Sequence, residues 1–139
     1  MLKRWCWLAL LAIAPLSFAA SSAAQPARAN YRFVSPEEFT DRFGFVATEP
    51  RELARDLFAA YTTEREGRRS ESLSITYPTW ETAVVIVEAV GLADDSVAAS
   101  RYRVELERLE DHWQLVWVGT QTRCQPGRGH QDWSGQLCR

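Results

Sequence analysis

The chain has 139 residues, of which 46% are hydrophobic and 24% charged, and its 16 basic and 18 acidic side chains give a formal net charge of −2. This length suits one domain with one core and is too short for two. The chain is mildly acidic, so it lacks the positive charge that drives non-specific binding to nucleic acid or anionic membranes. We therefore expect no nucleic-acid partner.

The first 24 residues have the three-part pattern of a secretory signal peptide. Lys3 and Arg4 supply the positive start, residues 5–18 are almost wholly apolar, and small residues follow up to Ala24. The apolar run is shorter than a bilayer span of roughly 20 residues, and an uncleaved N-terminal anchor is the alternative. We expect cleavage after Ala24 or a nearby alanine, no membrane span after cleavage, and a secreted or periplasmic location.

Residues 25–34 show no apolar periodicity and predict a mobile linker before a single domain over residues 35–139. Ser35 can cap a helix that has Pro36 at its first position and Glu38 at the capping-box position. These residues predict a short helix that ends near Gly44. A second helix of about 15 residues is predicted from Thr48 to before Gly67. Its apolar face consists of Leu53, Leu57, Phe58 and Tyr61.

From Glu71 onward the apolar period changes to two, which predicts four strands at residues 72–77, 82–90, 101–109 and 113–118, the first of them ended by Pro78. The second of these is apolar on both faces and should be central. The third alternates apolar with charged residues, so one face should pack in the core and the other should face solvent. In the fourth, Trp113 and Trp117 share a predicted face with Leu115, which favours core packing for both indoles.

Helices followed by strands with short turns predict an α+β fold, with one or two N-terminal helices packed on a four-stranded antiparallel sheet. This order resembles the cystatin-like and NTF2-like (nuclear-transport-factor-2-like) patterns, in which a curved sheet wraps a helix. Such folds serve inhibitors, enzymes and binding proteins alike, so the resemblance implies a fold and no activity.

Cys124 and Cys138 are the two cysteines that remain after the predicted cleavage, and in an oxidising compartment they should pair and close a C-terminal loop. The alternatives are a reactive thiol or a metal site that also uses His130. A closed zinc site needs four ligands, and this spacing matches no familiar zinc motif. We therefore predict a disulfide, no metal and no cofactor.

The loop between the cysteines contains the candidate ligand-binding residues, Arg128, His130, Asp132 and Trp133. An arginine fork suits carboxylate or phosphate, a histidine titrates near neutral pH, and an indole offers a stacking face. The loop is thus either a small anion or glycan site or a structural brace for an irregular tail. Spacing alone leaves both interpretations open.

The C-terminal 50 residues or so resemble a group of small secreted bacterial proteins, mainly cyanobacterial. The shared features are Gly91-Leu-Ala-Asp-Asp-Ser-Val97, Arg101-Tyr-Arg-Val-Glu-Leu106, Trp117-Val-Gly-Thr-Gln121 and the motif Cys-x-x-Gly-Arg-Gly-His-x-x-Trp-x-x-x-x-Cys, here residues 124–138. This resemblance implies a secreted protein and brings no activity with it.

No pair of potential catalytic residues can be distinguished from the charged residues that would form ordinary salt bridges. The sequence therefore favours a non-catalytic interaction or binding module. Its expected partner is another protein or an envelope component. One alternative is a small hydrolase that uses His130, Asp132 and Arg128. Another is a carrier of a small ligand, with a pocket between the sheet and the second helix.

Overall fold

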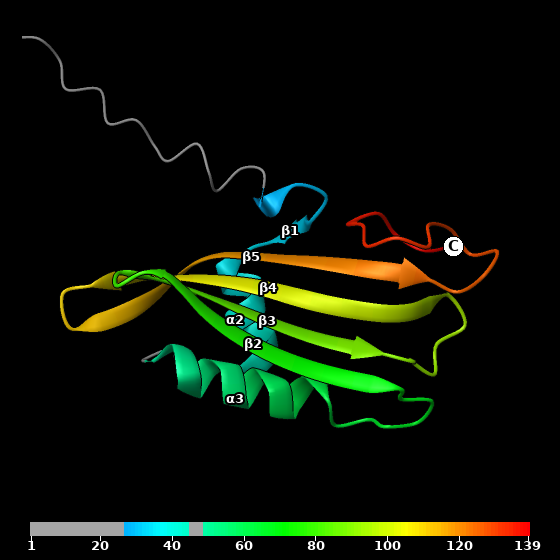
Figure 1. The fold of residues 1–139 in the computed structure, drawn as a ribbon, viewed down its shortest axis with the longest axis horizontal. Coiled ribbons are helices and arrows are strands. Elements are labelled where there is room, and N and C mark those ends of the chain that lie inside the picture. Colours follow the sequence, from blue (N-terminus) through cyan, green and yellow to red (C-terminus); the bar gives the residue numbers. More distant parts are fainter. Residues whose placement is uncertain (1–26, 45–48) are drawn as a thin grey trace, which may run out of the picture.

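A computed structural model of the protein describes residues 27–44 and 49–139, so the predicted signal peptide at residues 1–24 lies outside the described residues. The described chain is an α+β fold with two helices and a five-stranded antiparallel sheet (Figure 1). In chain order the elements are β1 (Arg32–Val34), α2 (Pro36–Phe43), α3 (Pro50–Tyr61), β2 (Ser70–Thr79), β3 (Thr82–Val90), β4 (Val97–Leu109) and β5 (His112–Cys124).

The strands lie in the order β1-β5-β4-β3-β2, so β2 to β5 form the predicted meander and β1 is an additional strand at its far edge. β1 pairs Arg32 with Thr120 and Val34 with Val118. The prediction of four strands is therefore wrong by one. The fifth strand lies within residues 25–34, where we expected a linker. It could not be predicted because a strand of three residues shows no periodicity and its partner strand lies more than 80 positions away in the sequence.

The start of α2 follows the predicted local chemistry, whereas Thr48, the predicted start of the second helix, lies outside the described residues. The Ser35 hydroxyl accepts a hydrogen bond of 3.0 Å from the Glu38 amide, and Pro36 occupies the first turn, as a capped N-terminus requires. α2 ends just before Gly44. α3 is somewhat shorter than predicted and ends at Tyr61, before the loop that leads to β2.

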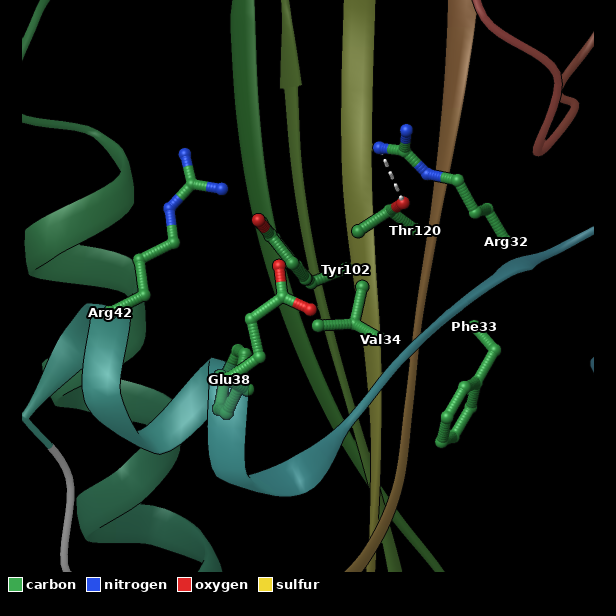
Figure 2. A pocket seen from close by; sticks show the side chains of 8 residues that line it. Arg32, Phe33, Val34, Glu38, Arg42, Tyr102 and Thr120 are labelled. Carbon is green, nitrogen blue, oxygen red and sulfur yellow. Dashed lines mark hydrogen bonds between the residues drawn. The ribbon is translucent and has the colours of Figure 1, made fainter.

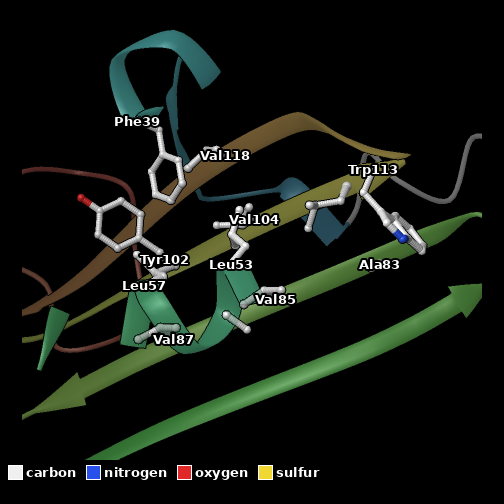
Figure 3. Packing of buried hydrophobic residues seen from close by; sticks show 12 residues of the cluster. Phe39, Leu53, Leu57, Ala83, Val85, Val87, Tyr102, Val104, Trp113 and Val118 are labelled. Atoms are coloured by element: carbon white, nitrogen blue, oxygen red, sulfur yellow. The ribbon is translucent and has the colours of Figure 1, made fainter. Parts of the chain in front are cut away.

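Both helices pack on one side of the sheet, which we call the helix face (Figure 3). Phe39 of α2 and Leu57 of α3 are at most 1% exposed, and they meet Val85, Val104 and Val118 from the three central strands, all fully buried. Close packing of this kind stabilises a small domain through the apolar area removed from water. Buried side chains of α3 therefore cover the helix face of β3 and β4.

A β-bulge in β5 corrects the predicted position of one tryptophan. Glu105 pairs with Trp117, but the neighbouring Leu106 pairs with Leu115, so one residue of β5 is extra. Trp113 and Leu115 consequently pack with the core, whereas Trp117 lies on the opposite side of the sheet, the open face. The prediction that both indoles share one face is wrong because the bulge breaks the period of two.

Candidate functional site

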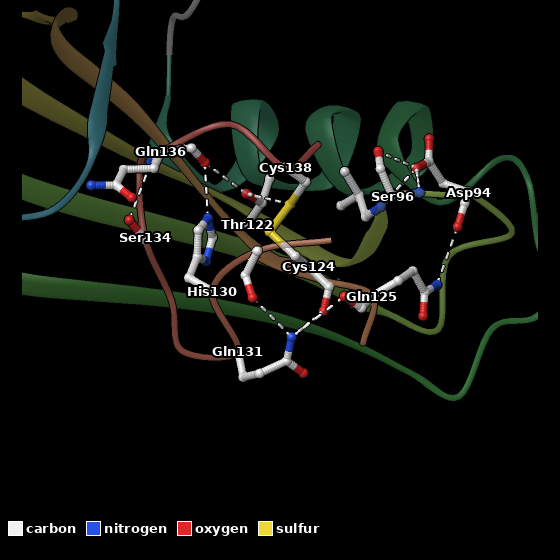
Figure 4. Close-up of a disulfide and its surroundings, with 12 residues drawn as sticks. Asp94, Ser96, Thr122, Cys124, Gln125, His130, Gln131, Ser134, Gln136 and Cys138 are labelled. Atoms are coloured by element: carbon white, nitrogen blue, oxygen red, sulfur yellow. Dashed lines mark hydrogen bonds between the residues drawn. A yellow bond between two sulfur atoms is a disulfide. The ribbon is translucent and has the colours of Figure 1, made fainter. Parts of the chain in front are cut away.

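The predicted disulfide is present and fastens the C-terminal tail to the end of β5 (Figure 4). Cys124 and Cys138 have Cα atoms 5.4 Å apart, within the usual range for a disulfide. The tail also pairs with the outer edge of β5, because Thr122 and Ser134 exchange two backbone hydrogen bonds of 2.8 and 3.1 Å. The tail thus continues the edge pairing that β1 begins.

His130 is half-buried under this tail, and both of its ring nitrogens face backbone carbonyl oxygens. Nδ1 lies 2.9 Å from the oxygen of Asp132 and Nε2 lies 3.0 Å from the oxygen of Gln136. A carbonyl oxygen only accepts, so a hydrogen bond at either ring nitrogen has the imidazole N–H as its donor. In this position the imidazole ties the tail together and offers no free nitrogen to a substrate.

Other polar groups of the loop are also engaged with backbone. The Gln131 Nε2 donates to the carbonyls of Cys124 and Gly129, each at 3.2 Å. The Cys124 amide donates to the His130 carbonyl at 2.9 Å, and the Arg139 amide donates to the Arg128 carbonyl at 2.8 Å. An irregular segment has many backbone groups to satisfy, and these contacts satisfy them.

The predicted cluster of Arg128, His130 and Asp132 does not converge on one point. Arg128 and Asp132 are exposed, and no ion pair joins their side chains among the contacts of the described chain. Asp132 reaches His130 through its backbone oxygen, and its carboxylate takes no part. This geometry favours the bracing interpretation of the loop over a catalytic one.

Cys124, His130 and Cys138 are also a potential metal-ligand group, since their ligand atoms lie within 4.8 Å of one another. The two sulfur atoms are bonded to each other, so neither is the thiolate that metal binding requires. The residues therefore fit a metal only after reduction of the disulfide, and then they supply three ligands.

Trp133, the fourth predicted residue, packs against two arginines of the open face. The guanidinium carbon of Arg101 lies 4.4 Å from the centre of the indole, and that of Arg123 lies 4.9 Å away. Arg101 also donates to the Gln121 side-chain oxygen at 2.6 and 2.9 Å and lies 5.6 Å from the Tyr31 ring. Cation–π contacts gain strength when they are shielded from water, so Trp133 holds the tail against the sheet.

A second cluster, which the sequence did not indicate, covers the middle of the open face. Arg28 donates to Glu105 Oε2 at 2.6 and 3.1 Å, Arg103 donates to Oε1 at 2.8 Å, and the Arg28 guanidinium lies 5.0 Å from the Trp117 ring. Glu105 is 9% exposed, so the face of β4 that we expected to meet water is covered here.

The environment of Glu105 determines its protonation. Burial alone raises the pKa of this carboxyl, but the hydrogen bonds and charges of Arg28 and Arg103 outweigh burial and bring the pKa below its usual range. Glu105 therefore stays ionised at neutral pH as the centre of an ion-pair network.

The two edges of the sheet differ in how they are covered. β1 and the tail pair with the outer edge of β5, whereas the outer edge of β2 pairs with no strand in residues 27–44 and 49–139. β2 carries one charged residue, Glu71, which pairs with Arg68 at 3.2 Å. Large apolar side chains are exposed along this strand and at the adjoining hairpin tips: Leu73 38%, Tyr77 46%, Trp80 73% and Leu109 44%.

Comparison of the chain with protein-family models, with curated proteins and with solved structures gives no significant match. Neither of the helices that the structure describes is both long and apolar enough to cross a bilayer.

Proposed function

We propose that the protein is a non-catalytic binding domain outside the cytoplasm, and that it recognises an extended segment of another secreted or envelope protein by adding that segment to β2. The observation that carries the proposal is the uncovered edge of β2, regular from Ser70 to Thr76 and interrupted only near its end by Pro78. An unpaired edge presents a row of backbone donors and acceptors, and natural sheets usually block such edges with charges, prolines or covering segments.

The side chains of β2 support recognition of a segment with a particular pattern. Leu73 and Tyr77 point to the side on which α3 packs, and both are partly exposed. Ser72 and Ser74 lie on the other side and are small and polar. A strand laid beside β2 would therefore place apolar side chains next to Leu73 and Tyr77 and polar ones next to the serines.

The location within this proposal rests on the leader-like residues 1–24 and on the disulfide, since disulfides persist in oxidising compartments. The non-catalytic part is supported by the engagement of His130 with two carbonyls and of Glu105 with two arginines. Both groups are used within the fold, so neither is open to serve as a base.

The test selects peptides from a random display library on the purified protein and measures amide hydrogen exchange with and without a selected peptide. We expect protection at alternate amides between Ser70 and Thr79, and peptides with apolar residues at every second position. Protection at residues 128–132 instead would contradict the proposal and favour the loop as the site.

A matched pair of variants sharpens the test. Leu73 and Leu137 are both exposed leucines, at 38% and 72%, but Leu137 belongs to the tail beside the covered edge. Leu73→Thr should weaken peptide binding roughly fivefold, since it removes about 1 kcal/mol of apolar contact. Leu137→Thr should leave the affinity unchanged, and equal effects of the two variants would refute the edge as the docking site.

A further inference from the structure

A small pocket of about 270 Å³ opens between β1 and α2, on the helix face and away from β2 (Figure 2). Four elements line it: Arg32 and Val34 come from β1, Glu38 and Arg42 from α2, Tyr102 from β4 and Thr120 from β5. Pockets for drug-sized ligands measure roughly 300–1,000 Å³, so this one suits a smaller molecule.

The floor of the pocket carries an unused hydrogen-bond donor. Tyr102 is 7% exposed, and its ring packs against Phe39, Phe43 and Tyr61 with centroid distances of 5.7, 5.6 and 5.3 Å. The ring is buried, but the hydroxyl oxygen is reached by solvent through the pocket, so a ligand there would replace water as its partner. The Tyr102 hydroxyl forms no hydrogen bond with any other group in the described chain, and it points toward the pocket (Figure 2).

Two arginines stand on opposite sides of this hydroxyl, Arg42 on α2 and Arg32 on β1 (Figure 2). The Arg42 guanidinium lies 5.5 Å from the Phe43 ring, and Arg32 reaches the Thr120 hydroxyl only at 3.5 Å. Within residues 27–44 and 49–139, neither arginine forms an ion pair, and Glu38 forms none with either of them. Both guanidinium forks therefore keep donors for a ligand.

The electrostatics of the pocket agree with this geometry. Burial raises the pKa of the Tyr102 phenol, the charges of Arg42 and Arg32 oppose that shift, and the charge of Glu38 adds to it. The hydroxyl is consequently a donor at neutral pH. Two arginines and one glutamate leave a single net positive charge around the pocket, which one carboxylate neutralises, whereas a dianion would keep an unbalanced negative charge whose desolvation is costly.

We propose that this pocket binds a small monocarboxylate, with the carboxylate held between Arg32 and Arg42 above the Tyr102 hydroxyl and the apolar part of the ligand against Val34 and Phe39. Arginine forks match the planar geometry of a carboxylate and bind it through two parallel hydrogen bonds. The pocket is separate from the edge of β2, so the carboxylate-binding proposal can be tested independently of the peptide-binding proposal.

The experiment titrates the purified protein with acetate, benzoate, inorganic phosphate and methylammonium, up to about 10 mM each, and follows backbone amide resonances by NMR. Benzoate should bind at one site and shift the amides of Val34, Phe39 and Thr120, and acetate should bind there more weakly because it lacks the ring. Absence of these shifts with benzoate would overturn the proposal, as would tighter binding of phosphate or methylammonium.

Variants separate this site from general attraction of anions to the surface. Arg42→Gln should weaken benzoate binding about tenfold and Tyr102→Phe about fivefold, because each removes donors to the carboxylate and the second retains the ring packing. Arg55→Gln is the matched control, since Arg55 is an exposed helical arginine on α3 that pairs with Asp56. Equal affinity in Arg42→Gln and wild type would overturn the proposal even if benzoate binds elsewhere.

Discussion

Opening the disulfide should destabilise the protein by an amount that follows from the length of the loop it closes. Cys124 and Cys138 are 14 positions apart, so the bond restricts a loop of 15 residues in the unfolded chain. In the chain-entropy treatment, such a restriction is worth about 3 kcal/mol at 25 °C. The free energy of unfolding should fall by this amount when the bond is absent.

The variant for this experiment is Cys124→Ala with Cys138→Ala. Alanine is preferable to serine because Cys124 is 2% exposed, and a hydroxyl buried at this position would add a desolvation cost unrelated to the loop. Urea denaturation of wild type and variant supplies the two free energies. Small proteins have urea m values of about 1–3 kcal/mol/M, so the midpoint should fall by roughly 1–3 M with little change in m.

The loss of stability should also affect the C-terminal tail before it affects the rest of the sheet. Amides of the tail, such as those of Ser134 and Arg139, are bonded within the segment that the disulfide holds, at 3.1 and 2.8 Å. In the variant their hydrogen exchange should speed up well before that of β3. A change in unfolding free energy below about 1 kcal/mol would refute the loop-closure argument, and equal loss of protection in β3 and the tail would refute its locality.

Two further predictions concern a glycine pair and the buried carboxylate. Gly91→Ala and Gly127→Ala both place alanine at a positive φ, 81° and 79°, but only at Gly91 would the new Cβ lie 2.4 Å from the Gly67 carbonyl oxygen. Chemical denaturation should show a loss of about 1 kcal/mol for Gly127→Ala and at least twice that for Gly91→Ala, and similar losses would contradict the clash. The native pKa of Glu105 is lowered from 4.5, so its ion pairs stabilise the fold above that pH, and this stability is lost as the pH falls through the native pKa. Glu105→Gln should therefore be less stable than wild type at pH 7, with a gap that narrows below about pH 4.5, and a gap independent of pH would contradict the assignment.

Features encoded by neighbouring residues could be predicted from the sequence. Ser35 and Pro36 set the start of α2, and the apolar residues at 82–90 coincide with β3. The turn between β4 and β5 occurs at Glu110, with a positive φ of 53°, in the gap between the strands predicted at 101–109 and 113–118. In each case the determining contacts lie within a few positions of one another, so local pattern and structure agree.

Features that depend on distant pairing could not be predicted in this way. β1 has only three residues and is defined by the edge of β5. Arg103 and Glu105 alternate with apolar residues, as in a strand with one solvent-exposed face. Their burial depends on Arg28, which is far away in the sequence. Trp117 lies on the opposite face from the one predicted because of a β-bulge, and the hydrophobic pattern of the sequence does not indicate that bulge. In the tail, the residue types were identified but not the partners, since His130 meets backbone oxygens.

The pairing of β1 with β5 also has a consequence for the order of folding. Arg32 and Thr120 are separated by 88 positions, whereas the hairpins β2–β3 and β4–β5 close over a few residues each. Loop-closure entropy makes the distant contact about 3 kcal/mol costlier to form first. The meander should therefore form before β1 docks, so contacts of β1 would be absent from the folding transition state and would govern the rate of unfolding.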